Sequence, residues 1–270
     1  MHHNEEMATD DELVLELEAG DARVSVWPAR GGRVGQIAVA GRPLLMFDPD
    51  GNPMLWGSYP MAPWAGRTRA GRFGFRGATH RLPVNLAPHA IHGTTFDRPW
   101  LVDDAGRDHC EMSIDLGWAL GGRAHQHLQL DERGLTCMLS VFADRAAMPA
   151  VIGWHPCFLK PRAADLHFAR MYRRDDEGIA VPELVAAPPG PWDDCFIEPL
   201  TPLRLHHPGL VVTVSSDCDH WVVYDQRDDV TCVEPQSGPP DGLNIPGGSA
   251  VLEPGDLLQR RMVVSWEPGD

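Results

Sequence analysis

Short runs in which apolar and polar residues alternate recur along this sequence, and this period of two constrains the fold most. Examples are LVLELEA at 13–19, CEMSIDL at 110–116 and RMVVSW at 261–266. Turn-forming residues interrupt the runs about every eight to twelve positions. The run HLQLDERGLTCMLSVF predicts a hairpin that turns at Asp131–Gly134. No long stretch keeps the helical period of about 3.6 residues, so the pattern predicts an all-β fold, a large antiparallel β-sandwich or barrel with little helix.

The domain organisation follows from where the strand-like runs begin and whether they are interrupted. The chain has 270 residues, enough for one large β domain or two small ones. Residues 1–10 are polar and acidic, and we expect a flexible tail there. The proline-rich stretch 182–191 is the candidate domain boundary, but strand-like runs continue on both sides of it. We therefore predict a single domain over residues 11–270.

The charge of the chain limits its partners. The formal net charge is −15, whereas nucleic acid and anionic lipid both require a positive surface. We therefore expect neither nucleic acid nor a membrane as a partner, and favour a neutral or cationic small molecule. Lys160 is the only lysine, and without a Gly-Lys-Ser/Thr triplet the chain has no phosphate-binding P-loop.

Cysteine usage and hydropathy bear on the location of the protein. The six cysteines form no Cys-x-x-Cys pair, which argues against a zinc ribbon and a disulfide framework. No apolar stretch is long enough to cross a membrane as a helix. These features favour a reducing, cytoplasmic location, and the sequence leaves both a monomer and a homodimer open.

Chemically capable side chains gather in four stretches that break the strand alternation and are rich in glycine, proline and aromatic residues. They are YPMAPWAGRTRAGRF (59–73), HAIHGTTFDRPW (89–100), VIGWHPCFL (151–159) and CVEPQSGPPDGLN (232–244). His155 stands in the middle of the most apolar stretch, and Glu234 follows a short apolar run. Buried side chains of these types are either satisfied by a structural partner or kept for proton transfer.

Two further side chains in these stretches are candidates for binding. Arg67 follows Gly66 in a rigid, aromatic-lined turn, where a fixed guanidinium suits a polyol or a carboxylate. His92 precedes Gly93, and a glycine allows a sharp turn or the close approach of a ligand. The alternatives are a solvated loop arginine and a structural histidine.

A metal site is the remaining chemical option. Cupin-like sites place two histidines one or three residues apart on a strand. Neither His92 nor His155 has such a partner, and His125 and His127, which do, lie in a plainly polar stretch. We therefore expect no metal and no cofactor.

Taken together, the stretches resemble the aldose 1-epimerase (galactose mutarotase) family from about Val24 to Val264. The resemblance rests on an ordered series of short motifs: GGRVGQIAVAG, PWAGR, HGTTFDRPW, HPCF, DDCF at 193–196, EPQSGPPDGLN and LEPG. It implies a large antiparallel β-sandwich, the galactose mutarotase-like supersandwich. It also implies an isomerase that interconverts the α and β anomers of a free hexose without cofactor or metal.

The resemblance assigns roles residue by residue. Glu234 is similar to the base that removes the C1 hydroxyl proton, and His155 to the acid that protonates the ring oxygen. Arg67, His92 and Asp193 resemble the residues that hold the sugar hydroxyls.

The chain departs from the family pattern in three places. Asp194 could replace Asp193, because DDCF is a weak match. Cys157 stands where the family usually has an aromatic residue, and His89 where it often has asparagine. These departures leave the preferred sugar open.

Two other functions remain open on the same fold. One is a hexose-6-phosphate 1-epimerase, in which Arg69, Arg72 and Arg98 would bind the phosphate. The other is a non-catalytic carbohydrate-binding protein.

Overall fold

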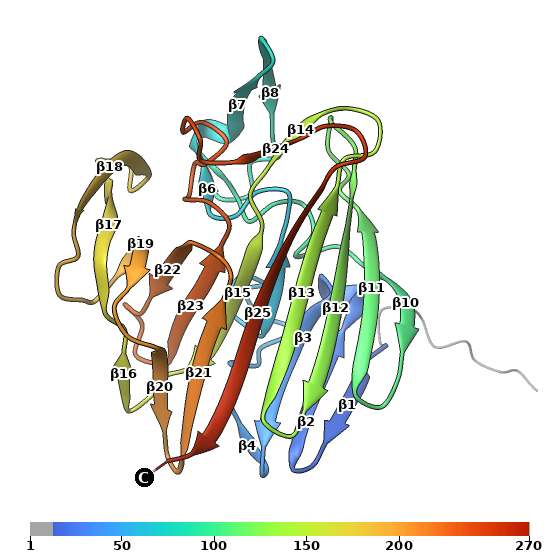
Figure 1. The fold of residues 1–270 in the computed structure, drawn as a ribbon, viewed down its shortest axis with the longest axis vertical. Coiled ribbons are helices and arrows are strands. Elements are labelled where there is room, and N and C mark those ends of the chain that lie inside the picture. The colour runs from blue at the N-terminus through green and yellow to red at the C-terminus, as the bar shows by residue number, and fades with distance from the viewer. Residues whose placement is uncertain (1–12, 270) are drawn as a thin grey trace, which may run out of the picture.

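Two large antiparallel sheets dominate the computed structural model, which describes residues 13–269. One sheet has eleven strands and the other has eight. In Figure 1 strands β25, β13 and β12 of the smaller sheet run in front of β2 and β3 of the larger one. The predicted all-β sandwich with little helix is confirmed, and the predicted tail at 1–10 lies outside the described residues.

The eleven-stranded sheet is ordered β1-β2-β3-β5-β15-β23-β22-β19-β17-β18, with β4 paired to β3. Its strands are β1 (Leu15–Ala19), β2 (Ala22–Trp27), β3 (Arg33–Val39), β4 (Arg42–Pro43), β5 (Ser58–Met61), β15 (Gly153–Leu159), β17 (Phe168–Arg174), β18 (Ala180–Ala186), β19 (Asp193–Pro199), β22 (His220–Tyr224) and β23 (Val230–Gln236). The proline-rich stretch 182–191 includes most of β18 and leads toward β19, and both strands belong to this same sheet.

The eight-stranded sheet is ordered β10-β11-β12-β13-β25-β21-β20-β16. Its strands are β10 (Leu101–Ala105), β11 (His109–Asp115), β12 (Arg123–Asp131), β13 (Gly134–Phe142), β16 (Ala163–Asp165), β20 (Leu203–His207), β21 (Leu210–Ser216) and β25 (Leu257–Pro268). The predicted hairpin is confirmed, because β12 and β13 pair from Asp131 and Gly134 outward.

Three small two-stranded sheets and two short 3-10 turns complete the elements within residues 13–269. The small strands are β6 (Arg67–Thr68), β7 (Arg72–Phe75), β8 (Ala78–Arg81), β9 (Ala90–Ile91), β14 (Met148–Ala150) and β24 (Ala250–Leu252), and the turns are η2 (Pro28–Arg30) and η3 (Arg69–Gly71). The hairpin of β7 and β8 projects from the end of the sandwich in Figure 1. No helix of the described chain is long and apolar enough to cross a membrane.

The main core lies between the two large sheets. Alternate side chains of the larger sheet point into this core, and the others point to the opposite face of the sheet. On β15, Trp154 and Phe158 pack in this core with residues of the eight-stranded sheet such as Leu139. The Trp154 indole N–H donates a hydrogen bond across the core to Gln126 of β12. Successive side chains of a strand point to opposite faces, so His155 and Cys157, which alternate with Trp154 and Phe158, face away from the core.

Candidate active site

Strands β15 and β23 bring two distant sequence stretches side by side. Their antiparallel register pairs Cys157 with Cys232. Two residues further along the ladder, the same register places His155 opposite Glu234. On the other edge of β15, His155 pairs with Tyr59 of β5. All these side chains belong to the face of the large sheet that points away from the main core. The two residues that the sequence assigns to proton transfer therefore meet on one sheet face.

His155 and Glu234 form a buried contact pair. The Nε2 atom of His155 lies 3.2 Å from Oε1 of Glu234, and the two residues are 5% and 2% exposed. The phenol ring of Tyr59 stacks on the imidazole, with ring centroids 4.8 Å apart. The Gln236 side chain donates a hydrogen bond to Glu234 Oε2 at 3.2 Å. Stacking and hydrogen bonding on both partners fix the orientation of the pair.

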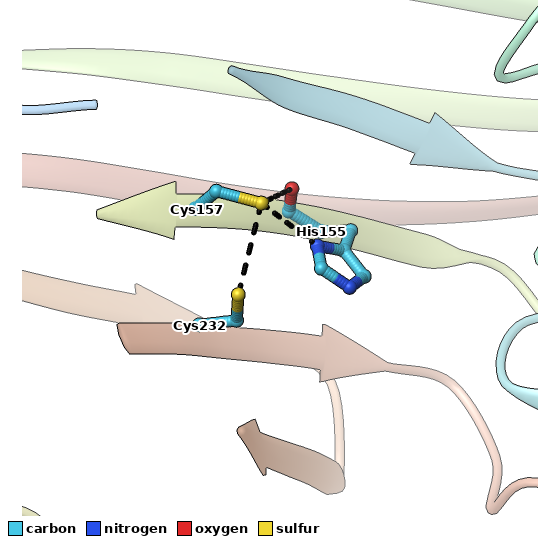
Figure 2. Close-up of side chains that lie close together, drawn as sticks. All are labelled: His155, Cys157 and Cys232. Carbon is cyan, nitrogen blue, oxygen red and sulfur yellow. Dashed lines mark hydrogen bonds between the residues drawn. The ribbon is translucent and has the colours of Figure 1, made fainter. Parts of the chain in front are cut away.

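The other ring nitrogen of His155 has a sulfur partner. Its Nδ1 atom lies 3.3 Å from Sγ of Cys157, and Cys232 Sγ lies 3.7 Å from the same sulfur. Figure 2 shows the two thiols and the imidazole turned toward one another from adjacent strands. The sequence marked Cys157 as a departure from the family pattern, and the structure shows that it contacts the histidine directly.

Burial and mutual charge shift the pKa values of this cluster. Burial raises the pKa of Glu234 to about 7, although the neighbouring His155 opposes the shift. For His155, burial lowers the pKa, but Glu234 and Cys157 favour the imidazolium and together raise it to about 9. Burial likewise raises the pKa of the Cys157 thiol, yet hydrogen bonding by Cys232 and the charge of His155 lower it to about 5. At neutral pH the pair can therefore hold an acid and a base together.

The pair lies in the wall of a cavity of about 290 Å³. This volume is at the lower end for small-molecule sites. The cavity is lined by every site residue that the sequence predicted: Arg67, His92, His155, Asp193 and Glu234. Five side chains from strands and turns far apart in the sequence thus reach one hollow.

Arg67 and Asp193 are joined in the cavity wall. An Nη2 atom of Arg67 lies 3.3 Å from Oδ2 of Asp193. The Nη1 atom of Arg174, on β17, lies 3.5 Å from Oδ2 of Asp193 and 3.6 Å from Oδ1 of Asp194. Asp194 also lines the cavity. Both aspartates therefore face the hollow, and Arg174 is a lining residue that sequence reasoning missed.

His92 lies in a tight turn whose backbone has positive φ angles. It follows β9 and has a φ of 61°, and Gly93 has a φ of 81°. A Cβ atom on Gly93 would lie 2.0 Å from the carbonyl oxygen of Ala62. Burial, with the nearby charges of His155 and Arg67, holds the pKa of His92 well below its usual value. The ring is therefore neutral at pH 7 and can donate and accept one hydrogen bond each.

The arginines considered for a phosphate do not line the cavity. Arg69 forms salt bridges with Asp175 and Glu177, and the Arg98 guanidinium donates to backbone carbonyl oxygens that include that of Asp115. Arg72 is exposed on β7. The two arginines that line the cavity, described above, both have carboxylate partners.

The histidine pair considered for a metal lies away from this cavity. His125 and His127 are on β12 of the smaller sheet, and both contact Glu111 of β11. Their contacts are those of a partly exposed ion-pair cluster. Tyr59 and Gln236, which do fix the acid–base pair, carried no signal in the sequence beyond their places in two of the four stretches.

The fold and the site define a β-sandwich protein with a buried histidine–glutamate pair in the wall of a small cavity. A family model described as aldose 1-epimerase matches residues 14–183, more than half of the chain. The chain belongs to the aldose 1-epimerase family. No curated protein matches the chain significantly.

Solved structures share the fold over nearly the whole chain. A candidate aldose 1-epimerase from Escherichia coli K12 is 21% identical with a TM-score of 0.85, covering 95% of this chain and 99% of its own. A galactose mutarotase-like protein from Clostridium acetobutylicum is 17% identical with a TM-score of 0.80, covering 95% of both chains. Galactose 1-epimerase from Lactobacillus acidophilus is 16% identical with a TM-score of 0.79, covering 98% and 97%. At these identities the likeness establishes the galactose mutarotase-like fold.

Proposed function

We propose that the protein is an aldose 1-epimerase that interconverts the α and β anomers of a free hexose. The observation that carries the proposal is the buried contact of 3.2 Å between His155 Nε2 and Glu234 Oε1 in the wall of a cavity that charged side chains also line. Membership of the aldose 1-epimerase family supports the reaction class. A protein that only binds sugar has no need of a matched acid and base.

The proposed reaction opens and recloses the sugar ring. The Glu234 carboxylate takes the proton of the C1 hydroxyl while the His155 imidazolium donates a proton to the ring oxygen. The bond between C1 and the ring oxygen breaks and leaves an aldehyde and a hydroxyl. Rotation about C1–C2 presents the other face of the aldehyde, and closure returns both protons to their original carriers.

The proposed binding roles follow from what each side chain can donate or accept. Arg67 is a donor only, Asp193 is an acceptor when ionised, and a neutral His92 offers one of each. This set suits the hydroxyl groups of a sugar, each of which donates and accepts. The carboxylate partners of the two cavity arginines favour a neutral hexose over a hexose phosphate, because a phosphate would have to displace them.

The direct test is the rate of anomer exchange. We expect the protein to accelerate mutarotation of α-glucose or α-galactose above the buffer rate, measured by polarimetry or by exchange NMR. Glucose 6-phosphate is the comparison substrate. Acceleration confined to the phosphorylated sugar would assign the alternative phosphate-specific reaction. Sugar binding without any acceleration would assign the non-catalytic alternative.

The variant Glu234→Gln tests the catalytic assignment. It keeps the size of the side chain and removes the base, so we expect kcat to fall at least about 100-fold while sugar still binds. Glu267→Gln, at an exposed glutamate of β25, is the matched control and should retain the rate. Equal rates in Glu234→Gln and the control would exclude Glu234 as the base.

A further inference from the structure

Cys157 contacts both Cys232 and His155 through its sulfur atom. The backbone N–H and C=O of Cys157 bond to Gly57 and Met46, on the side of β15 away from β23. Cys157 and Cys232 therefore form a non-hydrogen-bonded pair, the kind in which side chains approach most closely. Both residues are fully buried.

Two of the distances among the three donor atoms are close to those between ligand atoms in a zinc coordination tetrahedron. Zn–S bonds of about 2.3 Å and Zn–N bonds of about 2.0 Å place tetrahedral ligands roughly 3.8 Å apart for two sulfurs and roughly 3.5 Å apart for sulfur and nitrogen. The corresponding distances are 3.7 Å between Cys157 Sγ and Cys232 Sγ, and 3.3 Å between Cys157 Sγ and His155 Nδ1. All three atoms lie within 4.8 Å of one another, and no other such group of three occurs among residues 13–269.

We propose that His155, Cys157 and Cys232 form a Zn²⁺ site whose occupation switches off the acid–base pair. Two thiolates and an imidazole are soft ligands that select zinc over calcium or magnesium. Figure 2 shows that the donors come from two adjacent strands, so the sheet itself holds them in place. The site lies directly behind the cavity wall, because the carbonyl oxygen of Met54, a lining residue, is 3.7 Å from Cys157 Sγ.

The effect on the reaction follows from the lone pairs of His155, and this step rests on the proposed function. Zinc bound at Nδ1 takes the lone pair that a proton occupies in the imidazolium, and binding releases that proton and the proton of the Cys232 thiol. The Nε2 atom still carries its hydrogen toward Glu234, but giving it up would leave a metal-bound imidazolate. The ring can then no longer act as the acid, so the zinc-bound protein is inactive.

The test uses Co²⁺ as a coloured substitute for zinc, with the whole protein kept reduced by a phosphine. We expect one equivalent of Co²⁺ to give a thiolate-to-metal charge-transfer band and tetrahedral visible bands, and Zn²⁺ to abolish both. Cys157→Ser and Cys232→Ser should lose the charge-transfer band. The control Cys137→Ser removes a buried cysteine of β13 in the other sheet and should keep it. Absence of the band from the unaltered protein, or its persistence in both site variants, would overturn the proposal.

Activity gives the second measurement and separates the two proposals. One equivalent of Zn²⁺ should reduce anomer exchange to the buffer rate, and a chelator should restore it. The cobalt bands without any anomer exchange would support the metal site and refute the epimerase. Exchange that Zn²⁺ leaves unchanged would refute the switch and leave the epimerase intact.

Discussion

The two ring nitrogens of His155 have different partners, and this asymmetry determines what the residue can do. Nε2 faces the carboxylate of Glu234 and Nδ1 faces the sulfur of Cys157. A buried imidazole ordinarily loses its proton, because burial disfavours charge. Here two acidic groups flank the ring, and they outweigh the desolvation. The apolar surroundings of His155 therefore hold a charged ring in place and raise the pKa of its glutamate partner.

The pH profile of kcat/KM should report both groups. Glu234, with a pKa raised to about 7 by burial, must be deprotonated to act as the base, so the rate should rise as pH increases through about 7. His155, with a pKa raised to about 9, must be protonated to act as the acid, so the rate should fall as pH increases through about 9. The measurement is anomer exchange with a chelator present and the buffer rate subtracted at each pH. A rate that falls as pH increases through 7 would contradict these roles.

The residue types of the site were readable from the sequence, but the contacts among them were not. Strand alternation places His155 and Cys157 on one face of their strand, and Cys232 and Glu234 on one face of theirs. No local feature of the sequence shows that these two strands pair, because they lie about eighty residues apart and other strands alternate in the same way. The thiol contact with the imidazole depends on that pairing and was therefore not predicted.

At the scale of elements, the short strands β6 and β9 position two cavity side chains, Arg67 and His92, that do not belong to the two large sheets. β6 and β9 pair so that Arg67 lies opposite Ile91, which brings the turn at His92 beside Arg67. The backbone N–H of His92 donates to the carbonyl oxygen of Gly66. The sequence marked both glycine-flanked turns as candidate sites. It gave no sign of the two-residue ladder that joins them, since two residues are too few to show a period.

Gly93→Ala should show how much the turn at His92 matters. Gly93 has a φ of 81° and meets the Ala62 carbonyl, so an added Cβ brings both backbone strain and a clash. We expect the free energy of unfolding to fall by about 3 kcal/mol. Displacement of His92 should lower kcat/KM at least about 10-fold. Urea unfolding and anomer exchange are the measurements.

Gly77→Ala is the matched control for the turn. Gly77 has a φ of 79° but nothing within 4 Å of an added Cβ. This variant should lose about 1 kcal/mol from the backbone conformation alone and keep its kcat/KM. Equal losses of stability and rate in Gly93→Ala and Gly77→Ala would mean that the contact with Ala62 does not position His92.

At the scale of the whole molecule, the larger sheet separates stability from chemistry by its two faces. The face toward the smaller sheet carries the main apolar core, and the other face carries the acid–base pair and the cavity. Trp154 and His155 are neighbours in sequence, yet they belong to these two different environments. The period of two in the sequence predicted this sandwich, while the order of its strands depends on long-range pairing that the sequence pattern leaves open.

Truncation of a core residue should therefore reduce stability and leave the reaction intact. Leu139 of β13 is fully buried between the sheets, so Leu139→Ala should lower the free energy of unfolding by about 2–5 kcal/mol. Because the cavity lies on the far face of the other sheet, kcat and KM should stay unchanged at temperatures where the variant is folded. Leu257→Ala, at a leucine of β25 that is 47% exposed, is the control and should lose less than about 1 kcal/mol. Urea unfolding measures the change in stability, and anomer exchange measures kcat and KM. A raised KM in Leu139→Ala would show that the two faces are coupled through the sheet.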